Sequence, residues 1–172
     1  VDGLGVGDRV VVPFDLGCGT CRACTTGHGN TCRDGVALGF ERAAPGAFAE
    51  QVHVPQAAYN ALPIPDGVLA QDVAALGCRF TTAYHALVDR AAFAPGDWVA
   101  VHGCGGVGLS AVHVADALGA NVVAVDLMDE KLDRAEELGA VATVNAREVD
   151  DPAAEVRDIT DGGADISADA LG

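Results

Sequence analysis

The stretch that decides the fold is Trp98-Val-Ala-Val-His-Gly-Cys-Gly-Gly-Val-Gly108, in which an apolar run leads directly into closely spaced glycines. Residues 98–101 predict a buried strand, and residues 107–118, followed by Gly119, predict a helix. The segment 103–108 between them fits G-x-G-x-x-G, and in this strand–helix setting the pattern is typical of a turn that binds a dinucleotide pyrophosphate. The candidate cofactor-binding residues of the turn are Gly103, Gly105, Gly106, Val107 and Gly108.

Strands and helices continue to alternate on the C-terminal side of this turn. We expect strands at 121–125, 142–144 and 165–167, separated by helices at 129–138 and 152–159. Such alternation predicts an α/β fold with a doubly wound parallel sheet. A dinucleotide-binding sheet of this type has about six strands, so the four counted here predict a partial sheet.

Asp126 follows the second of these strands, 18 residues after Gly108. A carboxylate at this position binds both ribose hydroxyls and repels a 2′-phosphate, which favours NAD over NADP as the cofactor. Lys131 is the only lysine of the chain. It fits either a contact to the adenosine ribose or a solvated charge on a helix, and the sequence leaves both interpretations open.

Four cysteines are spaced Cys18-x2-Cys21-x2-Cys24-x7-Cys32, with Gly17, Gly19, Gly27 and Gly29 around them. Thiolates gathered this closely repel one another unless a soft cation neutralises them, and four thiolates close the tetrahedral shell of a zinc ion. The spacing therefore predicts a structural zinc site. An iron–sulfur cluster is the rival interpretation, but there the fourth cysteine follows after three residues and precedes proline, whereas here it follows after seven and precedes Arg33.

The region before the parallel sheet consists of short apolar segments broken by glycine and proline. Residues 9–12 and 47–54 predict strands, and 62–67, with two prolines, predicts a turn because proline cannot serve in a central strand or a helix. Two short helices are expected at 69–76 and 81–88.

The chain of 172 residues carries 25 acidic against 10 basic side chains, a net charge of −15. This charge disfavours nucleic acid and anionic membrane surfaces as partners. It fits either a saline cytoplasm or biased codon use. We find no run of about 18 apolar residues that could span a bilayer. The clustered cysteines favour a reducing compartment, and hence a cytoplasmic location. The start at Val1 without a signal pattern predicts an excerpt of a longer protein.

In their order along the chain, the four-cysteine lobe, Leu62-Pro-Ile-Pro-Asp-Gly67, Pro95-Gly-Asp-Trp-Val99 and the glycine turn resemble zinc-dependent alcohol dehydrogenases of the medium-chain dehydrogenase/reductase superfamily. The resemblance covers essentially the whole chain. It implies part of a GroES-like catalytic domain over 1–77, with a structural-zinc lobe at 18–32, and the first part of a Rossmann NAD-binding domain over 78–172. The active site would lie between the two domains.

The resemblance also assigns roles that the residues alone do not. Cys18, Cys21, Cys24 and Cys32 match the structural zinc ligands, Cys78 matches the third catalytic-zinc ligand, and Thr82 matches a contact to the nicotinamide end. Taken alone, a single cysteine such as Cys78 is more often a packing residue. The other two catalytic ligands and the proton-relaying hydroxyl fall upstream in this family, so the resemblance implies that this stretch alone is inactive and holds one zinc.

The implied reaction is oxidation of a small-molecule alcohol to an aldehyde or ketone by hydride transfer to NAD, with zinc polarising the alcohol. Family members are commonly homodimers or homotetramers when full-length. Dehydrogenases of polyols, sugars or amino alcohols share the same motifs and remain an alternative. A zinc-free quinone-type reductase fits less well because it lacks the four-cysteine lobe. Outside enzymes, the alternatives are a zinc- and nucleotide-binding sensor module and a ferredoxin-like electron carrier.

Overall fold

The computed structural model describes residues 3–74 and 76–172. The chain divides into two compact units, Val1–Cys78 and Arg79–Gly172. The sequence predicted a boundary one residue earlier, between Gly77 and Cys78. Within the described ranges, no helix is long and apolar enough to cross a lipid bilayer.

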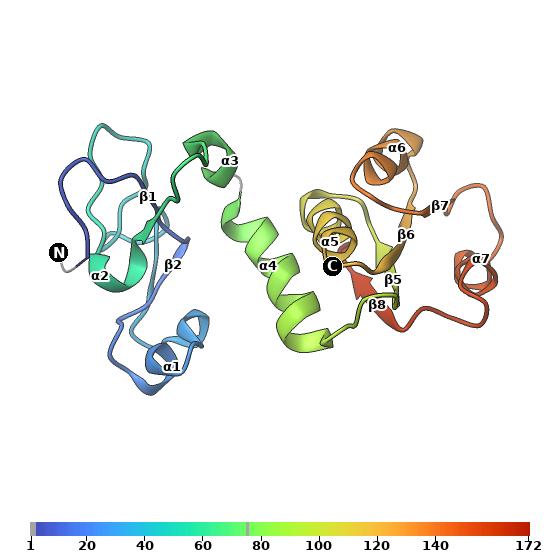
Figure 1. The fold of residues 1–172 in the computed structure, drawn as a ribbon, viewed down its shortest axis with the longest axis horizontal. Coiled ribbons are helices and arrows are strands. Elements are labelled where there is room, and N and C mark those ends of the chain that lie inside the picture. The colour runs from blue at the N-terminus through green and yellow to red at the C-terminus, as the bar shows by residue number, and fades with distance from the viewer. Residues whose placement is uncertain (1–2, 75) are drawn as a thin grey trace. The chain divides into compact units, whose positions relative to one another are not determined.

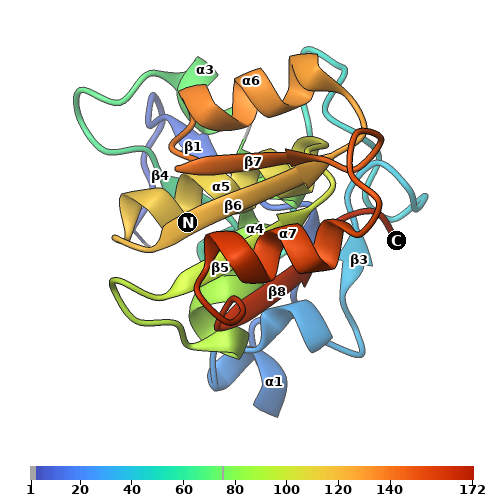
Figure 2. The ribbon, with the colours of Figure 1, turned by 90° about the vertical axis from the view of Figure 1, so that its right-hand side faces the viewer.

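The second unit is built on a four-stranded parallel sheet. Its strands are β5 (Trp98–His102), β6 (Asn121–Asp126), β7 (Ala142–Asn145) and β8 (Ile166–Asp169). They lie in the order β7-β6-β5-β8, visible from top to bottom in Figure 2. Val101 is paired with Ala124 of β6 on one side and with Ala168 of β8 on the other. The predicted α/β class with a parallel sheet is confirmed.

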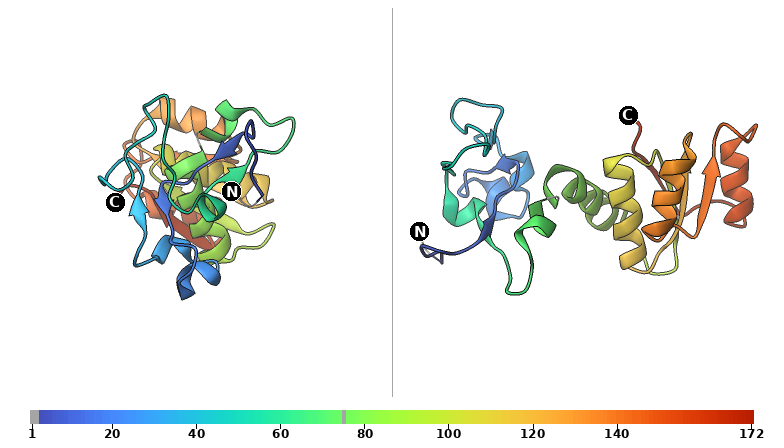
Figure 3. Two further views of the ribbon diagram at one scale, coloured as in Figure 1. Left: turned by 90° about the vertical axis from the view of Figure 1, so that its left-hand side faces the viewer. Right: turned by 90° about the horizontal axis from the view of Figure 1, so that it is seen from above.

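Helices cover both faces of this sheet. α5 (Gly106–Ala117) and α6 (Asp129–Glu137) lie on one side of the strands, and α7 (Pro152–Ile159) lies on the other, as the right panel of Figure 3 shows. α4 (Thr81–Tyr84) continues into the π-helical segment η3 (His85–Ala91) and packs against α5. α7 begins where the sequence provides a cap, because the Asp151 carboxylate accepts hydrogen bonds from the N–H groups of Ala153 and Ala154, each 3.0 Å long.

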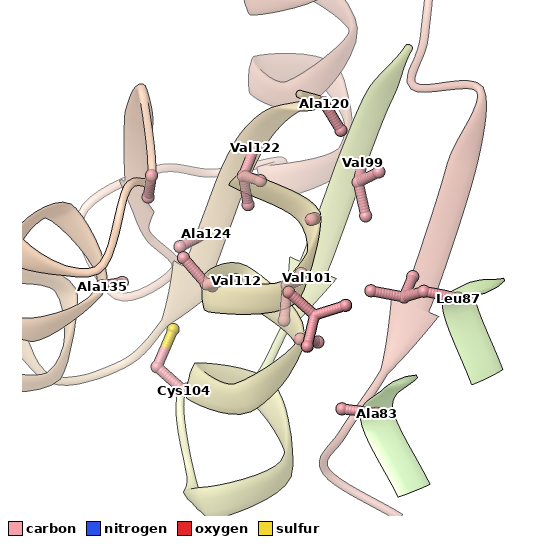
Figure 4. Packing of buried hydrophobic residues seen from close by; sticks show 14 of the residues in the cluster. Ala83, Leu87, Val99, Val101, Cys104, Val112, Ala120, Val122, Ala124 and Ala135 are labelled. Carbon is pink, nitrogen blue, oxygen red and sulfur yellow. The ribbon is translucent and has the colours of Figure 1, made fainter. Parts of the chain in front are cut away.

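Alternate residues of β5 point into two separate cores. Val99 and Val101 pack with Val112 of α5 and Leu87 of η3 on one face (Figure 4). Ala100 points to the other face and joins the cluster that includes Val156 of α7. Because both faces are covered, these strands read as continuous apolar runs rather than as alternating ones.

The first unit has little regular structure (Figure 1). Two antiparallel ladders of two residues per strand join β1 (Val10–Val11) to β4 (Leu62–Pro63) and β2 (Asp15–Leu16) to β3 (Val36–Ala37). Short helical turns lie between the strands: α1 (Arg22–Thr25), η1 (Gly29–Thr31) and α2 (Ala57–Asn60). After β4 follow α3 (Ala70–Ala74) and the π-helical turn η2 (Leu76–Phe80), which extends past the unit boundary at Cys78.

One prediction for this unit is wrong and another is confirmed only in part. Residues 47–54 form no strand, since no segment among the described residues pairs with them, and Phe48 lies fully exposed. The turn predicted at 62–67 is observed at residues 66–67, and its first two residues, Leu62–Pro63, form the strand β4 instead. Pro63 is tolerated because a two-stranded ladder consists only of edge strands. The helix expected at 69–76 is observed as α3, and its position 75 lies outside the described residues.

Candidate metal centre and dinucleotide site

The four predicted cysteines meet in the first unit. Cys18 follows β2, Cys21 and Cys24 stand at the start of and within α1, and Cys32 follows η1. All four are free thiols. Their sulfur atoms all lie within 4.8 Å of one another, and they are the one group of three or more close candidate metal ligands among the described residues.

The sulfur positions fit a tetrahedral ion. Zinc–sulfur bonds of about 2.3 Å place the four sulfurs of a tetrahedron roughly 3.8 Å apart. The observed separations are 3.5 Å for Cys21–Cys24, 3.8 Å for Cys21–Cys32 and 3.9 Å for Cys18–Cys24. In addition, the backbone N–H groups of Cys18 and Cys21 donate to the sulfurs of Cys32 and Cys18, which favours the thiolate form.

The pKa values of the thiols indicate that a cation is required for all four to be ionised. Hydrogen bonds from the backbone and hydroxyl of Thr20 lower the pKa of Cys18 to about 6. The backbone of Cys24 also lowers the pKa of Cys21, but the neighbouring Cys24 side chain and burial outweigh it and raise that pKa to about 11. Four adjacent thiols therefore do not all ionise by themselves. A divalent cation supplies the charge that makes four thiolates stable together.

Asn60 and Tyr59 hold the cysteine loop, and the sequence did not predict this role. Asn60 is buried; its amide accepts from the N–H of Gly17 and donates to the carbonyls of Gly17 and Pro55, all at 2.9 Å. The Tyr59 hydroxyl donates to the Cys24 carbonyl at 3.2 Å. No local signal marks these residues, because their partners Gly17 and Cys24 lie 43 and 35 positions away.

Tyr59 also explains two of the glycines around the cysteines. A Cβ at Gly17 would lie 2.8 Å from Tyr59 Cε1, and one at Gly29 would lie 2.5 Å from the Tyr59 hydroxyl oxygen. At these positions glycine makes room for the tyrosine ring. Backbone freedom is instead the reason for glycine at Gly19 and Gly27, whose φ angles are +75° and +82°.

The glycine turn of the second unit connects β5 to α5. Gly103 has a φ of +92° and donates its N–H to the Val125 carbonyl at 2.7 Å. A Cβ at Gly108 would lie 1.8 Å from the Gly103 carbonyl oxygen, so no larger residue fits there. Val107 packs its side chain against the core. Gly105 directly precedes α5. The first turn of the helix then presents three N–H groups that have no acceptor within it, those of Gly106, Val107 and Gly108.

Asp126, at the end of β6, is buried beside this turn. Its Oδ2 accepts from the N–H of Cys104 at 2.7 Å, and its Oδ1 accepts from the N–H groups of Leu127 and Met128 at 2.8 and 3.1 Å. Burial raises the pKa of Asp126, but these donors and Lys131 outweigh burial and lower it. Lys131 Nζ lies 3.5 Å from Asp126 Oδ2. The structure thus brings Asp126 and Lys131 together at the turn.

The other two predicted site residues lie on the segment that joins the two units and on α4. Cys78 is exposed at the end of the first unit and lies outside the four-cysteine group. Thr82 is exposed on α4 in the second unit.

A parallel sheet with a glycine turn after β5 and an ionised aspartate at the end of β6 defines a dinucleotide-binding domain. The preceding unit with four converging thiols adds a metal-binding lobe. Together they define the class of zinc-containing dehydrogenases.

Comparison with known proteins gives the family. The family described as "Alcohol dehydrogenase GroES-like domain" matches residues 1–66, and "Zinc-binding dehydrogenase" matches residues 106–172. An alcohol dehydrogenase of Geobacillus stearothermophilus is 41% identical over 148 residues, which cover 86% of this chain and 42% of that protein. The chain belongs to the zinc-dependent alcohol dehydrogenases of the medium-chain dehydrogenase/reductase superfamily.

Solved structures agree with this assignment. Alcohol dehydrogenase TADH from Thermus sp. ATN1 has a TM-score of 0.92 and 37% identity, covering all of this chain and 50% of that one. An NAD-dependent alcohol dehydrogenase has a TM-score of 0.83 and 38% identity, covering 96% of this chain and 47% of that one. The chain therefore spans about half the length of the proteins that it resembles.

Proposed function

We propose that the protein carrying this chain oxidises a small-molecule alcohol to an aldehyde or ketone and transfers the hydride to NAD. The observation that carries the proposal is the ionised Asp126 carboxylate beside the glycine turn, where a dinucleotide ribose binds. The relatives described as alcohol dehydrogenases, one of them NAD-dependent, support the reaction and the cofactor.

Asp126 favours NAD because its negative charge repels the 2′-phosphate that distinguishes NADP. Three of its contacts are to backbone N–H groups, and they fix the carboxylate at the strand end. The Lys131 contact, at 3.5 Å, is the longest of the four. A ribose hydroxyl can replace that contact without disturbing the other three, and Lys131 then remains beside the ribose.

We also propose that Cys18, Cys21, Cys24 and Cys32 hold a structural zinc and that Cys78 is one ligand of a catalytic zinc. When bound, the catalytic zinc polarises the alcohol oxygen and NAD accepts the hydride. Gly103, Gly105, Gly106, Val107 and Gly108 position the pyrophosphate with their backbone, and exposed Thr82 contacts the nicotinamide end. The proposed domains are residues 1–77 and 78–172.

The proposal also covers the location, the oligomeric state and the partners of the protein. We propose a cytoplasmic enzyme that acts as a homodimer or homotetramer on soluble alcohols and aldehydes. A net charge of −15 disfavours nucleic acid and anionic lipid as partners.

The decisive experiment screens alcohols as substrates of the zinc-loaded, full-length protein with NAD or NADP. The absorbance of the reduced cofactor measures the reaction. We expect oxidation of primary or secondary alcohols with NAD preferred over NADP. Absence of NAD-linked oxidation across primary, secondary, polyol and amino alcohols would contradict the proposal.

A double variant tests the cofactor assignment in the same assay. Asp126→Gly combined with Leu127→Arg removes the repelling carboxylate and adds a cation for a 2′-phosphate at an exposed neighbour. We expect the ratio of kcat/KM for NADP over NAD to rise by at least about tenfold, since one charge contact of this kind contributes more than about 1.4 kcal/mol. Leu127→Gln without the change at Asp126 is the control, and an unchanged ratio in the double variant would refute the role of Asp126.

A further inference from the structure

The side chain of Arg79 lies across the first residue of α5. A Cβ built on Gly106 would lie 2.4 Å from Arg79 Cδ, 2.9 Å from Nε and 3.0 Å from Nη1. Both residues belong to the second unit. The absence of a side chain at Gly106 is therefore what allows the guanidinium to reach the glycine turn.

The Arg79 guanidinium has no hydrogen bond or ion pair to any residue in 3–74 or 76–172. Its chain carries 25 acidic against 10 basic side chains, so carboxylates are abundant elsewhere on the surface. By contrast, Arg134 and Arg157 of the same unit are paired with Glu137 and Asp151. Within the described part of the chain, no residue competes with a ligand for the donors of Arg79.

The electrostatic potential where Arg79 lies is already positive without its charge. α5 is 12 residues long, and its N-terminus at Gly106 carries the positive end of the helix dipole and free N–H groups. A cation held at this end is unfavourable unless an anion lies with it. Asp126 does not supply that anion, because its oxygens are occupied by the N–H groups of Cys104, Leu127 and Met128 and by Lys131.

We infer that Arg79 is a cofactor-binding residue that donates to the pyrophosphate of the dinucleotide in the glycine turn. The inference rests on the proposed function, which places a dinucleotide there. Two negative phosphates satisfy both the guanidinium and the helix N-terminus, and a planar guanidinium suits bidentate contact to phosphate oxygens. Arg79 directly follows Cys78, so one short segment carries a proposed zinc ligand and a phosphate donor.

The test measures binding rather than turnover. Dissociation constants for NADH, ADP-ribose and adenosine are compared by calorimetry or competition in the full-length, zinc-loaded protein, for wild type and Arg79→Met. We expect Arg79→Met to weaken NADH and ADP-ribose binding by about 10- to 100-fold, the range of a charge-assisted hydrogen bond. Adenosine, which has no phosphate, should bind unchanged.

Arg157→Met is the matched control, because it makes the same change on α7, at the opposite face of the sheet from α5. It should leave all three constants unaltered, and Arg79→Lys, which keeps a cation, should lose less ADP-ribose affinity than Arg79→Met.

Two results would overturn the inference: NADH binding by Arg79→Met equal to that of wild type, or an equal loss of adenosine and ADP-ribose affinity. Failure of the proposed function looks different, since wild type itself would then bind neither NADH nor ADP-ribose.

Discussion

At the residue scale, Asp126 combines a proposed binding role with a structural one. Its position after a strand predicted a ribose contact, and the structure adds three backbone hydrogen bonds that tie the β5–α5 turn to the start of the next connection. The sequence could not predict the bond from Cys104, because it depends on the parallel pairing of β5 with β6, whereas the bonds from Leu127 and Met128 are local. A substitution at Asp126 therefore acts on stability as well as on cofactor choice.

This dual role predicts a pH-dependent loss of stability in Asp126→Asn. The pKa of Asp126 is lowered in the folded protein. The stability it contributes is therefore present above the unfolded-state pKa of about 3.9 and is lost as the pH falls through the folded-state value. We expect the variant to lose about 1–3 kcal/mol of unfolding free energy at neutral pH.

The measurement for Asp126 is urea unfolding as a function of pH. Below about pH 4 the difference between wild type and Asp126→Asn should shrink, because the wild-type carboxyl is protonated first in the unfolded state and, at lower pH, in the folded state as well. Asp133→Asn, at an exposed position of α6, removes the same charge without a buried partner; it is the control and should not be destabilised at neutral pH. A constant difference at every pH would show that the charge of Asp126 contributes nothing to stability.

At the element scale, the first unit depends on contacts between elements that are too short to be stable alone. α2 has four residues, fewer than an isolated helix needs. It is held by Asn60, whose amide satisfies both backbone groups of Gly17 immediately before Cys18. The metal lobe and α2 should therefore stabilise each other.

Asn60→Ala should loosen the metal site. The substitution leaves the N–H and carbonyl of Gly17 and the carbonyl of Pro55 without their partner in a buried place, which costs about 1–3 kcal/mol. We expect zinc to be released to a chelator severalfold faster than from wild type, measured by a colorimetric zinc indicator.

Tyr59→Phe is the milder companion to that variant, because it removes only the hydroxyl that bonds to the Cys24 carbonyl. Its release rate should fall between those of wild type and Asn60→Ala. Asn30→Ala, an exposed asparagine in η1 of the same lobe, should release zinc as wild type does. Equal release rates for Asn60→Ala and wild type would refute the positioning role.

At the scale of the whole molecule, the sequence predicted what is encoded locally. The four cysteines lie within one loop, and the glycine turn and Asp126 flank consecutive elements, so spacing alone identified them. Tyr59, Asn60 and Arg79 act on residues far along the chain, at Cys24, Gly17 and Gly106, and only the fold makes those pairs. The strand predicted at 47–54 is wrong for the same reason, since an apolar segment becomes a strand only beside a partner.

The net charge of −15 is the molecule-wide feature whose effect can be measured directly. Asp126 is the one buried acidic side chain among residues 3–74 and 76–172, so the remaining described carboxylates lie at or near the surface and repel one another. The Debye length, the distance over which exposed charges interact, shortens from about 10 Å at 0.1 M salt to about 3 Å at 1 M. We therefore expect the midpoint of thermal unfolding to rise by several degrees between these concentrations of KCl, because repulsion weakens in the compact state.

Neutralising surface acids separates this charge effect from other effects of salt. Glu130→Gln, Asp133→Asn and Glu136→Gln together remove three negative charges from the exposed face of α6. This triple variant should be more stable than wild type at low salt and should gain less from added KCl, since less repulsion remains to be screened. If KCl raises the unfolding midpoint of the triple variant as much as that of wild type, the salt response does not come from charge repulsion. The acidity would then reflect biased codon use rather than adaptation to a saline cytoplasm.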